Sequence, residues 1–153
     1  MENISRKIVV AIDGSKPSQN AIRYSVDLAK NLGAQVIVLH TIQSAQKIGY
    51  WVFIDRHFDK ELHQYAEKIC KEAKEIAMEL GHQVQIETRE GVPYEEIIKF
   101  IKEHPDTILL VMGTYGHSLT EKRLIGSTTD RVIREISKEG ISVPVTLVPF
   151  VQE

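Results

Sequence analysis

The sequence lacks several features that mark particular classes of protein. It has a single cysteine, Cys70, which excludes an internal disulfide and, among helix-spaced apolar residues, is expected to be a small buried side chain. No apolar run reaches the roughly 18 residues of a membrane span, and the start MENISRKIVVAID has no long apolar core, so we expect a cytoplasmic protein. Nineteen basic residues are offset by 21 acidic ones without a dense basic block, which disfavours nucleic-acid binding.

Standard catalytic signatures are also missing. There is no GxxxxGK[ST] loop, no GxGxxG after the first predicted strand, and no acidic residue ending the second, where His40 and Thr41 stand. A motor NTPase and a dehydrogenase are therefore disfavoured. The sequence also has no GxSxG elbow, and its histidines show no metal-ligand spacing. We accordingly predict no catalytic residue and no metal site, and we expect His40 to be a core residue.

The chain does contain a regular alternation of strand-like and helix-like segments. Its 153 residues, 42% of them hydrophobic, predict one soluble domain spanning residues 1–153. Short apolar or β-branched runs predict strands at 7–12, 35–41, 84–88, 107–112 and 143–148. Apolar residues at helical spacing predict helices at 17–32, 59–80, 94–102 and 128–137.

This alternation indicates an α/β fold with an open parallel sheet and helices on both faces. Right-handed crossovers leave two main strand orders, 2-1-3-4-5 and 3-2-1-4-5. We favour 3-2-1-4-5, because it puts the polar strand 84–88 and the proline-flanked strand 143–148 at the edges. The first and fourth strands then lie side by side where the winding reverses, which is where ligands bind in such sheets.

Two groups of residues are predicted to meet at that reversal. Asp13 directly follows the first strand, where its carboxylate could contact ribose hydroxyls or hold a metal that also binds phosphate; the alternative is an ordinary Asp-Gly turn. After the fourth strand come Gly113, Gly116 and Gly126, then Ser127 and Thr128 at a helix start. Glycines let a ligand approach the backbone, and Ser127 could cap the helix while its amides face an anion. Taken singly, the glycines could be a strand terminator and a turn; together they favour a phosphate site.

Two neighbouring segments are left open. His117, Lys122 and Arg123 could add positive charge near phosphates, although basic side chains in loops are usually solvated. Tyr50, Trp51 and Phe53 could form a lid, a subunit contact or a packed loop.

Five segments together resemble a known family. They are the opening KIVVAIDGS, the second strand VIVLHT, the turn Gly91-Val92-Pro93, the loop MGTYGHSLTEKRLIGSTTDRVI and the closing VPVTLVP. The loop has the spacing Gly-x2-Gly-x9-Gly-Ser/Thr. On these segments the chain resembles the universal stress proteins, in particular their ATP-binding branch.

The resemblance implies a 3-2-1-4-5 sheet of the adenine nucleotide alpha hydrolase-like type, commonly a homodimer paired through the last strand, with ATP in the crevice and Mg²⁺ held through the phosphates. By position, Ala11, Ile12 and Asp13 line the adenosine side and Thr41 meets adenine, while the ribose and phosphates are surrounded by Met112, Gly113, Gly116, Gly126, Ser127 and Thr128. Thr41 stands where the family more often has valine. A contact between adenine and the backbone of residue 41 would survive this change of side chain.

The main functional hypothesis is therefore a regulatory, stress-response protein that binds ATP with little or no hydrolysis, because no general base or activated nucleophile is evident. The alternatives are a slow ATPase or phosphoryl transferase that uses Asp13 with magnesium, and a dimeric interaction module that binds no nucleotide. A flavin carrier, with Tyr50 and Trp51 stacked on the ring, is a distant fourth.

Overall fold

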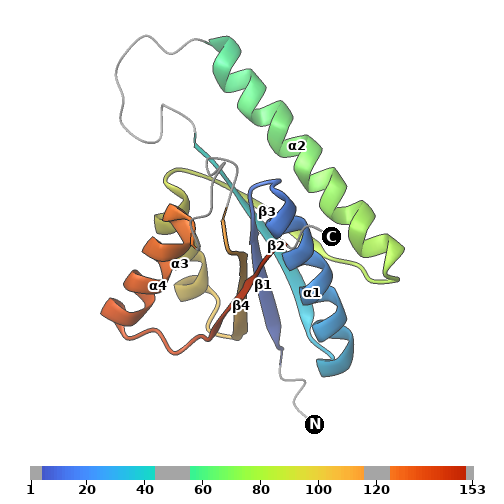
Figure 1. Ribbon diagram of the computed structural model, residues 1–153, viewed down its shortest axis with the longest axis vertical. Coiled ribbons are helices and arrows are strands. Elements are labelled where there is room, and N and C mark those ends of the chain that lie inside the picture. The colour runs from blue at the N-terminus through green and yellow to red at the C-terminus, as the bar shows by residue number, and fades with distance from the viewer. Residues whose placement is uncertain (1–4, 44–55, 116–124, 151–153) are drawn as a thin grey trace.

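The fold is built on one parallel β-sheet, which Figure 1 shows between two pairs of helices. The computed structural model describes residues 5–43, 56–115 and 125–150. The strands are β1 (Lys7–Ile12), β2 (Gln35–Ile42), β3 (Gln85–Glu90), β4 (Thr107–Gly113) and β5 (Val145–Val148). The helices are α1 (Lys16–Leu32), α2 (Arg56–Glu79), α3 (Pro93–Glu103) and α4 (Ser127–Glu139). The sheet order β3-β2-β1-β4-β5, with every pair parallel, confirms the predicted topology and both predicted edge strands.

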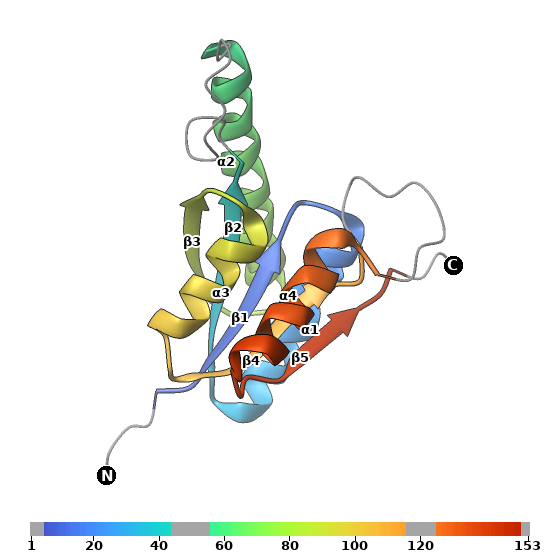
Figure 2. The ribbon, with the colours of Figure 1, turned by 90° about the vertical axis from the view of Figure 1, so that its left-hand side faces the viewer.

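Two apolar layers hold the helices to the sheet. Successive side chains of a strand point to opposite faces, so Ile8 and Val10 of β1 pack in the layer of α1 and α2, while Val9 and Ala11 pack in the layer of α3 and α4. Figure 2 shows α3 and α4 together on one face. The central strands are buried on both sides, which explains why their sequences are continuous apolar runs rather than alternating ones.

Several element ends differ from the sequence prediction. The fifth strand begins at Val145 rather than 143, because Pro144 has no N–H to donate, although its carbonyl accepts from the Leu110 amide at 3.0 Å. Helix α2 begins at Arg56 rather than 59, and β3 continues to Glu90 rather than ending at 88. Helix boundaries with clear caps were predicted more closely. Ser15 caps α1 and Gly33, in the left-handed conformation at φ 64°, ends it.

The strand ends create the space for a site. Chain leaving β1 enters α1 on one face of the sheet, whereas chain leaving β4 leads to α4 on the other face. The two strands are neighbours, with Ala11 paired to Met112, so the chain diverges to opposite faces at their carboxyl ends. None of the helices in the described part of the chain is both long and apolar enough to cross a membrane.

Candidate functional site

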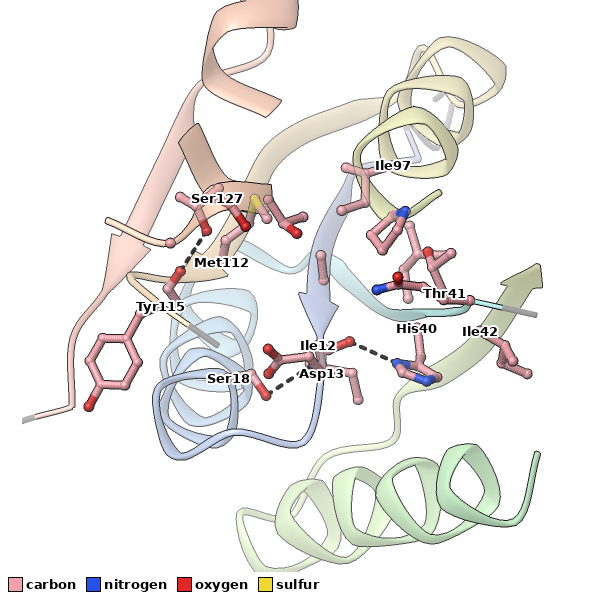
Figure 3. A pocket seen from close by; sticks show the side chains of 18 of the residues that line it. Ile12, Asp13, Ser18, His40, Thr41, Ile42, Ile97, Met112, Tyr115 and Ser127 are labelled. Carbon is pink, nitrogen blue, oxygen red and sulfur yellow. Dashed lines mark hydrogen bonds between the residues drawn. The ribbon is translucent and has the colours of Figure 1, made fainter. Parts of the chain in front are cut away.

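A pocket of about 720 Å³ lies at the carboxyl ends of β1, β2 and β4. Figure 3 shows Ile12 and Asp13 at the end of β1, with His40 and Thr41 of β2 on one side and Met112, Tyr115 and Ser127 on the other. The lining includes the predicted site residues Ala11, Ile12, Asp13, Thr41, Met112, Gly113, Gly126, Ser127 and Thr128. Gly116, the remaining one, lies outside the described residues. Residues predicted from two separate segments are thus brought to one pocket.

Asp13 sits in a tight turn that leaves one carboxylate oxygen open. Its Oδ1 accepts a hydrogen bond from the Ser15 amide at 2.9 Å, and its own amide donates to Ser18 Oγ at 3.4 Å. Gly14 between them has φ 83°, so the Asp-Gly turn weighed in the sequence is present. Among the described residues no donor reaches Oδ2. The turn therefore orients the carboxylate through Oδ1 and leaves Oδ2 available to a ligand.

Two side chains on the α2 side of the sheet hold the backbone at Asp13. The Tyr65 hydroxyl of α2 donates to the Asp13 carbonyl at 2.7 Å, and His40 Nδ1 lies 2.9 Å from the Ile12 carbonyl oxygen. Because a carbonyl only accepts, we assign the His40 proton to Nδ1. A Cβ on Gly14 would overlap the Tyr65 hydroxyl. The peptide that carries Asp13 is consequently fixed from both β2 and α2.

Both of these donors are neutral near pH 7. Burial lowers the pKa of His40, against the opposing effects of its hydrogen bond to the Ile12 carbonyl and the charge of Asp13. Burial also raises the pKa of Tyr65, with smaller contributions from the Asp13 and Glu72 carboxylates. The sequence correctly predicted His40 as a buried residue, 7% exposed, but not its place in the pocket wall. It placed Tyr65 only within the predicted helix 59–80, because no local pattern reveals a contact 52 residues away.

The two described glycines of the predicted phosphate loop have different roles. A Cβ on Gly113 would lie 2.7 Å from Pro17 Cβ and 2.9 Å from the Pro17 carbonyl carbon. Glycine is thus required there because the end of β4 packs closely on the first turn of α1, whereas the sequence suggested ligand approach as the reason. Gly126 has an ordinary φ of −72°, so its backbone conformation does not require glycine.

The start of α4 faces the pocket without a side-chain cap. Gly126, not Ser127, is the N-cap residue, so the predicted capping role of Ser127 is wrong; Ser127 is the first residue of the helix. The reason is the extended backbone of Gly126, which ends the non-helical segment there and places the helix start at Ser127, one residue earlier than predicted. Amides in a first helical turn have no intrahelical acceptor, and the helix dipole adds partial positive charge. Ser127 and Thr128 both line the pocket, so this helix end offers donors suited to an anion.

The opposite wall is mostly apolar, with one unusual polar group. Leu39, Pro93 and Ile97 line it together with Thr41. Thr41 is 9% exposed, and its Oγ1 has no hydrogen-bond partner among the described residues. Sequence reasoning missed the three apolar residues of this wall, because nothing local distinguishes core positions from pocket positions. A flat apolar group with a polar edge would suit such a wall.

Some predicted features fall outside the described residues. These are the basic residues His117, Lys122 and Arg123, and the aromatic residues Tyr50, Trp51 and Phe53. Within residues 5–43, 56–115 and 125–150, no group of three or more histidine, cysteine or acidic side chains is arranged to hold a metal ion.

Comparison with known sequences gives one family. A model of the universal stress protein family matches residues 5–149. The universal stress protein MJ0531 of Methanocaldococcus jannaschii is 33% identical to this chain over 138 residues, covering 87% of this chain and 78% of that protein.

Solved structures show the same fold. The universal stress protein UspA from Lactobacillus plantarum superposes with a TM-score of 0.79 at 20% identity, covering 94% of this chain and 97% of that one. A universal stress protein from Archaeoglobus fulgidus in complex with dAMP has a TM-score of 0.69 at 23% identity, covering 95% and 98%. A universal stress protein in complex with cAMP has a TM-score of 0.65 at 23% identity, covering 94% and 95%.

Proposed function

The chain belongs to the universal stress protein family, and on that premise we propose that its pocket binds an adenine nucleotide, ATP in particular, as a regulatory ligand. The observation that carries the proposal is the composition of one pocket: an uncapped helix start on one side, an apolar wall on the other, and an oriented carboxylate between them. Two family members of the same fold hold dAMP and cAMP, which supports a nucleotide here.

Each part of a nucleotide matches a part of the pocket. The phosphates would lie at the first turn of α4, near Gly126, Ser127 and Thr128, where free amides and the helix dipole favour negative charge. The ribose hydroxyls would donate to the open oxygen of Asp13. The base would pack on the apolar wall at Thr41. A cavity of about 720 Å³ is within the usual range for small-molecule sites.

Magnesium would be held through the phosphates. The described residues offer no cluster of metal ligands, so the ion depends on phosphate oxygens and water for most of its coordination. It would neutralise phosphate charge and fix the conformation of the triphosphate. Gly116, outside the described residues, is proposed to complete the phosphate site as the resemblance implies.

We propose regulation rather than turnover because two titratable side chains of the described pocket wall, His40 and Tyr65, are already engaged with the backbone. His40 holds the Ile12 carbonyl, and Tyr65 holds the Asp13 carbonyl. A slow ATPase is the second candidate, because Oδ2 of Asp13 is open and could orient a water or magnesium. Phosphate release above a buffer blank that disappears in Asp13→Asn would favour that candidate.

Calorimetry on nucleotide-free protein tests the binding proposal. ATP with magnesium should bind to the wild type, and Asp13→Asn should weaken binding by about tenfold, since it removes the charge that accepts from ribose. Asp27→Asn on the exposed face of α1 is the matched control and should bind as wild type does. Wild-type protein that takes up no ATP in the presence of magnesium would refute the proposal.

We extend the proposal to the assembly of the protein and its location in the cell. We propose a homodimer in which β5, a sheet edge in this chain, pairs with β5 of a second copy. We also propose that the protein works in the cytoplasm, which fractionation of cells followed by immunodetection would test.

A further inference from the structure

Thr41 has a buried hydroxyl that the described protein does not use. Its Oγ1 is shielded and unpartnered, and the residue as a whole is 9% exposed. A buried hydroxyl without a hydrogen bond lowers the stability of a folded protein. Valine has nearly the same shape and would avoid this cost, so packing alone gives no reason for threonine at this position.

The described neighbours of Thr41 do not satisfy the hydroxyl: Arg89, its partner on β3, is bound to Glu103, and the pocket residues beside it are apolar. Residue 41 points to the same face of the sheet as Leu39, two residues earlier, and this face packs against Ile97 of α3. Leu39, Ile97 and Pro93 line the pocket beside Thr41, and none has a polar side-chain atom. The paired part of β1 also ends at Ile12, opposite His40, so Thr41 borders the cavity beyond the β1 ladder.

A change of rotamer would let the hydroxyl turn toward the cavity. The methyl group and Oγ1 of threonine are attached to the same carbon and have nearly the same size. A turn of about 120° about χ1, from one staggered rotamer to another, would bring Oγ1 to the position that the methyl group held, while the methyl group moves to the position of the hydrogen on Cβ.

From this we propose that Thr41 is a specificity-determining residue whose hydroxyl forms a hydrogen bond with an edge atom of the bound base. The inference rests on the proposed nucleotide function and deepens it. In this arrangement the apolar wall contacts the face of a flat ring, and the Thr41 hydroxyl meets the edge of the ring beside Gln43, which also lines the pocket. Because a hydroxyl both donates and accepts, it fits a ring nitrogen or an exocyclic amino group.

The proposal predicts that stability and affinity change in opposite directions when the hydroxyl is removed. Thr41→Val should raise the melting temperature of the nucleotide-free protein, because an unsatisfied buried polar group is removed. The same change should weaken nucleotide binding, because a polar atom of the base loses its partner. A residue with a merely structural role would not couple a more stable free protein to weaker binding.

The test compares wild type, Thr41→Val and Thr41→Ser. Each protein is titrated with ATP in the presence of magnesium, and its affinity for inorganic triphosphate is measured by competition with ATP. Thr41→Val should bind ATP roughly tenfold more weakly and triphosphate unchanged, and its melting temperature should rise by about 2–4 °C. Thr41→Ser keeps the hydroxyl and should bind ATP within about twofold of wild type. Thr146→Val on β5, outside the pocket lining, is the matched control and should leave ATP affinity unchanged.

Two outcomes would overturn the inference while the proposed function stands: Thr41→Val binding ATP as well as wild type does, or losing affinity for ATP and triphosphate equally. A fall in its melting temperature would likewise identify Thr41 as a structural residue. Wild-type protein that binds no ATP at all would instead refute the proposed function, so the two failures are distinguishable.

Discussion

Gly113 illustrates how a single residue can carry a packing requirement inside a binding pocket. It lines the cavity, yet the space where its Cβ would lie is filled by Pro17 of α1. Two of the nearest atoms to that Cβ belong to the backbone of residues 17 and 18, which cannot rotate away as a side chain can. The glycine therefore sets how closely β4 approaches α1, and only indirectly the shape of the site.

Substitution of this glycine should be costly. Gly113→Ala should lower the free energy of unfolding by about 1–3 kcal/mol through overpacking, measured by urea denaturation. Gly140→Ala is the comparison: its added Cβ meets nothing within 4 Å, but φ is 65°, so it should show only the conformational cost of about 1–2 kcal/mol. Full wild-type stability of Gly113→Ala would mean that the contact with Pro17 relaxes freely.

His40 should give the fold a pH dependence. Its pKa is lowered by burial in the folded state, so the unfolded chain binds a proton at a higher pH than the folded protein does. This contribution to stability is complete above the unfolded pKa, near 6.5, and is lost as pH falls below it.

Urea denaturation between pH 7.5 and 5 measures this effect. His40→Gln should have a shallower decrease in stability than wild type over this range, because one group that titrates differently in the two states is gone. His82→Gln, on the turn after α2 and outside the pocket, should keep the wild-type slope. Equal slopes for wild type and His40→Gln would show that other groups cause the pH dependence.

At the scale of elements, α2 is attached to the site through Tyr65. The helix packs on the α1 side of the sheet, and the Tyr65 hydroxyl joins it to the turn between β1 and α1. His40 holds the preceding carbonyl from β2, and its ring lies edge-on to the Tyr65 ring with centroids 6.5 Å apart. A strand and a helix distant in sequence thus position the Asp13 turn together.

Removal of the Tyr65 hydroxyl should loosen this attachment. Tyr65→Phe should reduce the free energy of unfolding by about 0.5–1.5 kcal/mol, the usual net value of one hydrogen bond, measured by chemical denaturation. It should also increase amide hydrogen exchange in the 13–15 turn, because the Asp13 carbonyl loses its partner. Tyr24→Phe, exposed on α1, serves as the control and should change neither. Unaltered exchange in the turn of Tyr65→Phe would show that His40 alone suffices.

At the scale of the whole molecule, β5 is an edge strand whose outer side pairs with no other strand of the described residues. The Pro144 carbonyl accepts a hydrogen bond from the Leu110 amide of β4, and the Val148 carbonyl accepts one from the Thr114 amide. The backbone groups of every second residue, 144, 146 and 148, therefore face β4. By the alternation of a strand, Val145 and Leu147 turn their amides to the free edge. Unpaired edge groups of this kind are a template for a second chain.

Val145→Pro should therefore weaken the proposed dimer. It removes an outward N–H while sparing the bonds to β4, and sedimentation equilibrium should show at least a roughly tenfold rise in the dimer dissociation constant. Val145→Ala trims the side chain but keeps the amide, so it should remain closer to wild type. A wild-type chain that is monomeric at all concentrations, or a dimer unaffected by Val145→Pro, would exclude pairing through β5.

Much of this architecture was predictable because the signals are local. Apolar runs such as 35–41, helix stops such as Gly33 and proline near the last strand depend on neighbours in sequence, and the strand order follows from them with few alternatives. Asp13 and the residues around Gly126 could be assigned to one crevice for the same reason, since the carboxyl ends of parallel strands share an edge.

Only the tertiary structure decided what each of these residues contacts. Pro17 fills the space beside Gly113, Tyr65 reaches the Asp13 carbonyl across 52 residues, and the Thr41 hydroxyl has no described partner. The sequence by itself determined the elements, their order and the edge where a ligand would bind, because backbone preference and apolar periodicity are local properties. The contacts that shape the pocket depend on distances between chain segments far apart in sequence, and such distances exist only once the helices have packed on the sheet.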